Sequence, residues 1–116
     1  MRTNMQDRIN KIINVLDTNK AEAIEVFDLR DKDYFVDYVI IASSIGARHT
    51  EALLDYLKRG LKPEEQFLGT DESGEWIAAD LGDILIHVMT PEYRSRYDIE
   101  SFLSTLNKTV ESEEEK

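Results

Sequence analysis

The chain contains no cysteine. This absence excludes disulfide bonds, a thiolate nucleophile and every metal site that depends on cysteine ligands. It also agrees with a reducing compartment, where structural disulfides are rare. No apolar run approaches the roughly 20 residues that a membrane-spanning helix needs, and the N-terminus lacks the apolar segment of a signal peptide. We therefore expect a soluble, cytoplasmic protein that makes no contact with membranes.

Cationic residues are scarce as well. The 116 residues include 14 lysines and arginines against 24 aspartates and glutamates, which gives a formal net charge of −10. Binding to nucleic acid through its phosphates requires a basic face, and no cluster of lysine and arginine provides one. An acidic surface instead attracts basic proteins, although negative charge also serves solubility alone. We expect little direct contact with nucleic acid.

The most regular stretch of the sequence covers residues 74–89. Residues 76–79 and 84–89 are apolar and rich in strand-forming side chains, and the turn between them contains Gly82. This pattern predicts a β-hairpin. The second run is apolar on both faces, which is typical of an interior strand covered on both sides.

Hydrophobic periodicity predicts the remaining elements. We expect helices at 4–17, 47–61 and 93–106, the last with a break near 97–98, and further strands at 23–29, 38–42 and 66–69, with a turn at 71–74. The fold class is therefore α/β (α+β), a mixed sheet of about five strands flanked by helices. The length predicts a single domain over residues 1–107, and the acidic tail 108–116 is expected to be disordered.

No catalytic constellation is evident in the sequence. Asp80 and Asp83 are three positions apart around a glycine, so they favour a capped turn over convergence on a metal ion. The segment 43–46 resembles a phosphate loop but has one glycine and no following lysine, which favours a capped turn. His49 and His87 have no partner at a metal-ligand spacing and are interpreted as structural or surface residues. We expect no enzymatic activity, no cofactor and no metal ion.

Two arginines near the C-terminus leave a further alternative. Arg94 and Arg96 stand beside Tyr93 and Tyr97, so they could stack on a nucleic-acid base. A solvated helix face explains the same pattern, and we favour that interpretation in so acidic a chain.

The only tryptophan marks a candidate binding surface. In an extended strand, Trp76, Ala78 and Asp80 share one face, whereas the residues between them point to the other. The predicted outer face then carries an aromatic anchor and a carboxylate with a small residue between them, which suits a basic protein partner. The alternative is that the last helix covers Trp76.

The sequence also resembles a known family. The segments that carry the resemblance are Asp37-Tyr38-Val39-Ile40-Ile41-Ala42, Arg48-His49, Gly74-Glu75-Trp76, Asp80-Leu81-Gly82-Asp83-Ile84, His87-Val88 and Tyr97-Asp98-Ile99-Glu100. In this order and at this spacing they resemble the ribosomal silencing factor (RsfS, Iojap-like) family. The resemblance implies a translational repressor that binds a basic protein of the large ribosomal subunit at the intersubunit face and blocks subunit joining. It also implies a nucleotidyltransferase-like fold without the catalytic motif, and a possible homodimer when the protein is free.

Candidate contact residues follow from this resemblance. Trp76, Asp80 and Asp83 match the family's strongest motif, Tyr97 and Asp98 match the later one, and Arg48 matches an arginine at a helix start. With Ala78 from the predicted patch they form the expected partner-binding set. The segment 43–47 departs from the family's threonine- and glycine-rich turn, which leaves its role open. The competing hypothesis is an enzyme that binds nucleotide and magnesium near residues 43–48 and Asp80.

Overall fold

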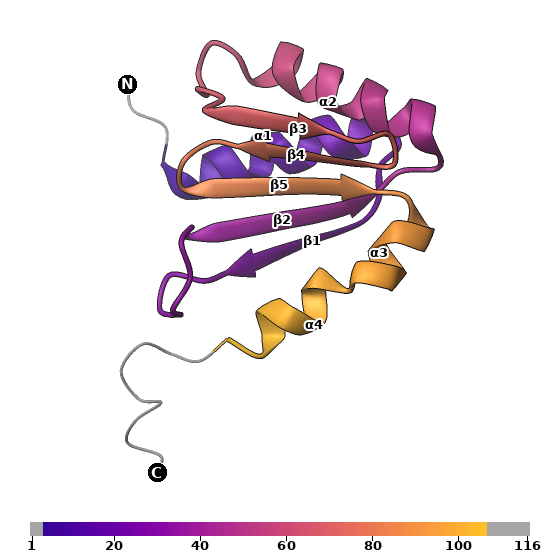
Figure 1. Cartoon of the computed structure of the whole chain (residues 1–116). Helices are drawn as coiled ribbons and strands as arrows, with labels where there is room; N and C mark the ends of the chain where they lie inside the picture. Colours follow the sequence, from indigo (N-terminus) through magenta and orange to yellow (C-terminus); the bar gives the residue numbers. More distant parts are fainter. Residues whose placement is uncertain (1–3, 107–116) are drawn as a thin grey trace.

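A computed structural model describes residues 4–106 of the chain. Its elements are α1 (Met5–Thr18), β1 (Glu22–Asp28), β2 (Tyr38–Ser43), α2 (Ala47–Leu61), β3 (Gly69–Glu72), β4 (Trp76–Asp80), β5 (Ile84–Met89), α3 (Pro91–Tyr97) and α4 (Ile99–Ser104). The strands form one five-stranded sheet in the order β1-β2-β5-β4-β3 (Figure 1). The predicted mixed sheet with flanking helices is confirmed.

β5 occupies the centre of this sheet. It pairs parallel with β2 and antiparallel with β4, so β4 and β5 form the predicted hairpin. Ile84, Ile86 and Val88 are fully buried on one face of β5. On the other face Leu85 and His87 are only half-buried. The interior position is confirmed, but the strand is fully covered on one face only.

Helices α1 and α2 seal that buried face. Each carries an apolar stripe at the three-and-four spacing that one helix face requires: Ile9, Ile12 and Leu16 on α1, and Leu53, Leu57 and Leu61 on α2 are all buried. The helices approach closely at Gly60, where a Cβ atom would lie 2.9 Å from Val15 Cγ2. Glycine at this position is what allows the two helices to pack so tightly.

The opposite face is only partly covered, by α3 and α4 (Figure 1). Leu103 of α4 packs with Val39, Ile41 and Met89 at the β2–β5 side of the sheet. Asp98 ends α3 in the left-handed conformation, with φ 47°, and its side chain accepts from the Ser101 amide at the start of α4. The predicted break in the last helix is therefore confirmed, and within residues 4–106 no helix covers the face of β3.

The third strand differs from its prediction. We expected a strand at 66–69 and a turn at 71–74, but β3 covers Gly69–Glu72. Its pairing extends to Glu72 opposite Ile77, and the turn is compressed into the three residues between Glu72 and Trp76. Gly74 takes a φ of 81° there. The prediction was wrong because β3 is an exposed edge strand, whose stability comes from the ladder with β4 and not from apolar side chains.

A charged network fastens α1 to the end of the hairpin. The Arg8 guanidinium donates to both carboxylate oxygens of Asp83, at 2.8 and 2.9 Å, and to both of Glu65, also at 2.8 and 2.9 Å. The Glu65 side chain is only 9% exposed. The hydrogen bonds from Arg8 hold the pKa of Asp83 below its usual value. Removing Arg8 would leave a carboxylate in a largely dry environment.

We predict that Arg8→Met lowers the free energy of unfolding by roughly 2–4 kcal/mol, because it leaves the Glu65 carboxylate buried without a cationic partner. Arg30→Met is the matched control, since Arg30 makes a similar two-atom contact with Asp28 at an exposed site. Urea unfolding should show the control close to the parent protein. Equal stabilities for the two variants would contradict the structural importance of the network.

Candidate interaction surface

β4 turns one side of its residues into the core and the other outward. Ile77 and Ala79 are fully buried, whereas Trp76, Ala78 and Asp80 are half-buried on the opposite face. The predicted facing of the strand is confirmed. It follows from the period-two alternation of a strand whose inner side packs under α2.

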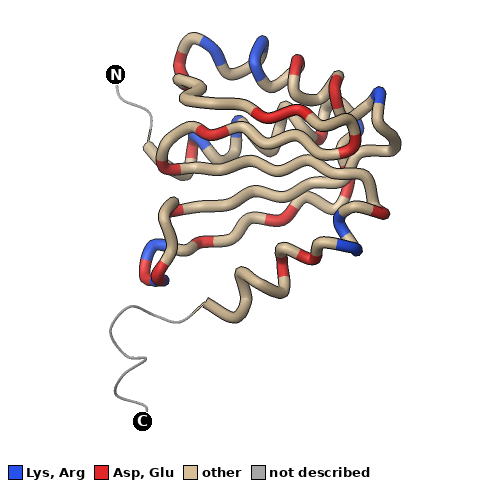
Figure 2. The backbone as a smooth tube through the Cα atoms, in the orientation of Figure 1, with Lys and Arg blue, Asp and Glu red and all other residues tan. Residues whose placement is uncertain are grey.

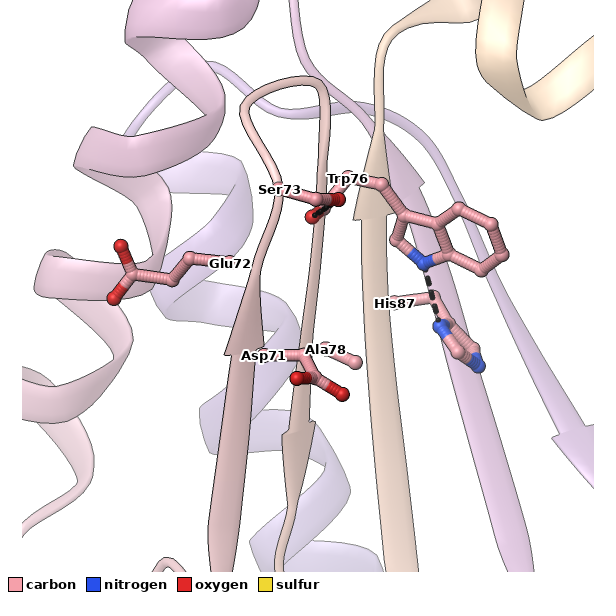
Figure 3. Close-up of a pocket in the computed structure, with 6 residues that line it drawn as sticks. All are labelled: Asp71, Glu72, Ser73, Trp76, Ala78 and His87. Atoms are coloured by element: carbon pink, nitrogen blue, oxygen red, sulfur yellow. Dashed lines mark hydrogen bonds between the residues drawn. The ribbon is translucent and has the colours of Figure 1, made fainter.

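The indole of Trp76 is held by two neighbours. Its Nε1–H donates to His87 Nδ1 at 3.0 Å (Figure 3), and its ring centroid lies 5.0 Å from that of Tyr97 on α3. The alternative that the last helix covers Trp76 is thus partly correct, because α3 supports one side of the ring. The remaining surface of the indole lines a depression.

This depression continues along the sheet as one groove. Its first part, about 280 Å³, is lined by Asp71, Glu72, Ser73, Trp76, Ala78 and His87. Its second part, about 290 Å³, is lined by Phe35, Gly69, Thr70, Asp71, Ala78, Asp80 and Leu85. Asp71 and Ala78 belong to both parts, so we treat them together as the β3–β5 groove.

The β3–β5 groove has an apolar floor and an acidic rim. Trp76, Ala78 and Leu85 supply floor contacts, and Asp71 and Asp80 supply carboxylates at the rim. No lysine or arginine occurs on β3, β4 or β5, and Figure 2 shows the acidic positions running along β3. Such a surface favours a cationic partner that also brings apolar contact area.

His87 is uncharged at neutral pH. Burial lowers its pKa from 6.5 to about 4, because the imidazolium form loses solvation. The hydrogen bond from Trp76 also requires an unprotonated Nδ1, which places the ring proton on Nε2. The floor of the groove therefore adds no positive charge that would offset its rim.

This pKa makes stability depend on pH. Between pH 6.5 and about 4 the unfolded chain binds the proton that the folded chain excludes, so stability falls as the pH is lowered. We predict that the parent loses about 2 kcal/mol between pH 7.5 and 5 through His87. His87→Gln, which can still accept from Trp76, should remove that part of the slope in urea titrations. An unchanged slope in the variant would contradict the assignment, since His49 is common to both proteins.

The other predicted contact residues lie in different surroundings. The Asp83 carboxylate is bound by Arg8 on α1 and is not among the residues that line the groove. Asp80 lines the groove and also accepts from the Gly82 amide at 2.8 Å, so its turn-capping role is confirmed. Arg48 lies exposed in the first turn of α2, away from the groove lining.

Arg94 is a residue whose environment the sequence did not reveal. We expected a solvated helix face, but the side chain is buried. It donates to the Ala23 carbonyl at 2.8 Å, to Ser43 Oγ at 2.9 Å and to Glu100 at 2.6 Å. Arg94 therefore ties α3 and α4 to the ends of β1 and β2, which sets Tyr97 beside Trp76. No sequence pattern distinguishes it from the neighbouring Arg96, which is exposed.

Segment 43–46 and the histidine beside it have structural roles. Ser44 is buried and its hydroxyl bonds that of Thr50. His49 Nδ1 accepts from the Ile45 amide at 3.0 Å, and its Nε2 lies 2.8 Å from the Asn19 carbonyl oxygen. The predicted capped turn differs from the structure, because the N-cap residue Gly46 makes no side-chain capping hydrogen bond. The interpretation of His49 as a structural residue is confirmed.

The residues that the nucleotide hypothesis requires, segment 43–48 and Asp80, do not lie together. Ser43 lies opposite Met89 and Asp80 lies opposite Leu85, so the two mark opposite ends of β5. Leu85 and Met89 are four positions apart, which corresponds to about 13 Å along a strand. Within residues 4–106 there is no group of three or more histidine, aspartate or glutamate side chains that could hold a metal ion.

Together these features define an α+β domain with one helix-sealed sheet face and one open face that bears an acidic groove. The family model described as "Ribosomal silencing factor during starvation" matches residues 2–116. The chain belongs to this family, which agrees with the resemblance seen in its motifs. None of the helices in the described part of the chain is long and apolar enough to span a membrane.

Individual relatives support the assignment. The chain is 32% identical over 92 residues to the ribosomal silencing factor RsfS of Zymomonas mobilis, which covers 77% of this chain and 69% of the relative. It is 29% identical over 99 residues to the mouse "Mitochondrial assembly of ribosomal large subunit protein 1", covering 79% of this chain and 43% of the mouse protein. A crystal structure of a Chromobacterium violaceum protein superposes with a TM-score of 0.82 at 28% identity, covering 93% of this chain and 94% of that one.

Proposed function

We propose that this protein represses translation in the cytoplasm by binding a basic protein of the large ribosomal subunit through the β3–β5 groove. The bound domain occupies surface that the small subunit needs, so joining of the subunits is blocked sterically. No bond is made or broken in this mechanism. The observation that carries the proposal is the half-exposed Trp76 on an open sheet face whose rim is acidic.

The composition of the groove favours a protein partner over RNA. Its rim carboxylates repel a phosphate backbone, and the net charge of −10 adds to that repulsion. Lysine or arginine side chains on a partner can instead pair with Asp71 and Asp80, while apolar atoms cover the indole. Tryptophans that a partner buries at the centre of an interface commonly dominate its binding energy.

The family and its relatives support the large subunit as the target. The family description is one of ribosome silencing, and the name of the mouse relative refers to assembly of the mitochondrial large subunit. For the present chain we propose the large subunit of its own ribosome. Within the groove, we propose that Trp76, Ala78 and Asp80 contact the partner.

We predict that Trp76→Ala weakens binding to purified large subunits by about 2 kcal/mol, roughly a thirtyfold rise in Kd, as measured by cosedimentation. Asp80→Lys should slow association, because a lysine at this position repels a positively charged partner. Asp55→Lys is the matched control, with the same charge change on the exposed side of α2. Circular dichroism should first confirm that the three variants fold.

The same samples should be compared in a subunit-joining assay. The parent and the Asp55→Lys variant should block joining, and the two groove variants should lose that block in proportion to their weaker binding. Binding of the parent to small subunits, or undiminished binding by both groove variants, would refute the proposed surface.

A further inference from the structure

β3 leaves one edge of the sheet unpaired. Among residues 4–106 the strand order is β1-β2-β5-β4-β3, in which β3 has a neighbour on one side only, and all four of its residues are exposed. An unpaired edge presents backbone donors and acceptors that another extended segment can use. β3 therefore offers a second kind of contact beside the groove that it helps to line.

The hydrogen-bond pattern identifies which backbone groups of β3 face away from β4. The Ser73 amide donates to the Trp76 carbonyl at 3.1 Å, which makes these two residues a hydrogen-bonded antiparallel pair. Such pairs alternate with non-hydrogen-bonded ones. In the observed register Thr70 and Glu72 fall in the non-hydrogen-bonded positions. Their N–H and C=O groups therefore point away from β4, toward the open edge.

The side chains at this edge select the occupant by charge. Asp71 faces the groove, and Glu72, opposite the buried Ile77, faces the other side of the sheet. A strand laid along β3 therefore meets a carboxylate on each of its faces. A second copy paired through the same edge would set acidic residues against acidic residues, which is unfavourable. A segment rich in lysine or arginine meets the opposite charge on both faces.

We propose that the free edge of β3 binds an extended Lys/Arg-rich segment of the partner as a sixth strand of the sheet. This inference rests on the proposed function, because Asp71 belongs both to the edge and to the rim of the β3–β5 groove. Backbone hydrogen bonds to Thr70 and Glu72 fix the segment, and its side chains reach Asp71 from the edge. The exposed Leu68, just before β3, supplies an apolar contact at one end.

Thr70→Pro tests the edge directly. Proline removes the outward N–H at position 70 and leaves the ladder with β4 intact, since proline is tolerated where the missing donor faces solvent. Thr70→Ala is the matched control because it keeps the N–H. We expect cosedimentation with large subunits to weaken about tenfold for the proline variant and to stay at the parent value for the alanine variant. Equal binding by the two would overturn the inference while leaving the groove as the binding surface.

A second experiment uses the unaltered protein and does not depend on the ribosome. An alternating Lys-Thr octapeptide is added, with an alternating Glu-Thr octapeptide as control, and amide exchange is followed by NMR. The lysine peptide should slow exchange at Thr70 and Glu72 at least tenfold, and the glutamate peptide should not. Unchanged exchange with both peptides would overturn the edge inference. Protection by the lysine peptide in a protein that does not bind large subunits would instead refute the proposed function alone.

Discussion

The hydrogen bond from Trp76 to His87 orients the largest side chain on the open sheet face. An indole N–H that is half-buried needs an acceptor, and the neutral imidazole on the adjacent strand provides it at 3.0 Å. Tyr97 supports the ring from α3, and α3 is itself held by the buried Arg94. The shape of the groove therefore depends on contacts that reach from β1 to β4.

The placement of charge complements this geometry. Where the chain holds a cation in a largely buried position, as at Arg8 and Arg94, carboxylates or carbonyls surround it. Those arginines hold helices against the sheet, and no lysine or arginine is among the residues that line the groove. An acidic groove with an apolar floor is suited to a basic protein and unsuited to a nucleic-acid backbone.

Much of the fold could be predicted because strong periodic patterns determine it. The helix at 47–61 and the strand at 84–89 have the bounds that their apolar spacing indicated, and the outward facing of Trp76 followed from simple alternation. β3 was misplaced because an exposed edge strand carries no apolar signal. The roles of Arg8 and Arg94 were missed because their partners, such as Glu65 and Ser43, lie far away in the sequence.

The most direct test is whether the open face is covered when the protein meets the large ribosomal subunit. Because the chain has no cysteine, single cysteines report on single positions. Ser73→Cys places a cysteine in the lining of the groove, and Asn14→Cys places one on the exposed side of α1. Excess large subunits should slow maleimide labelling strongly at position 73 and leave position 14 unchanged. Equal rates at position 73 with and without subunits, or protection at position 14 alone, would contradict the account.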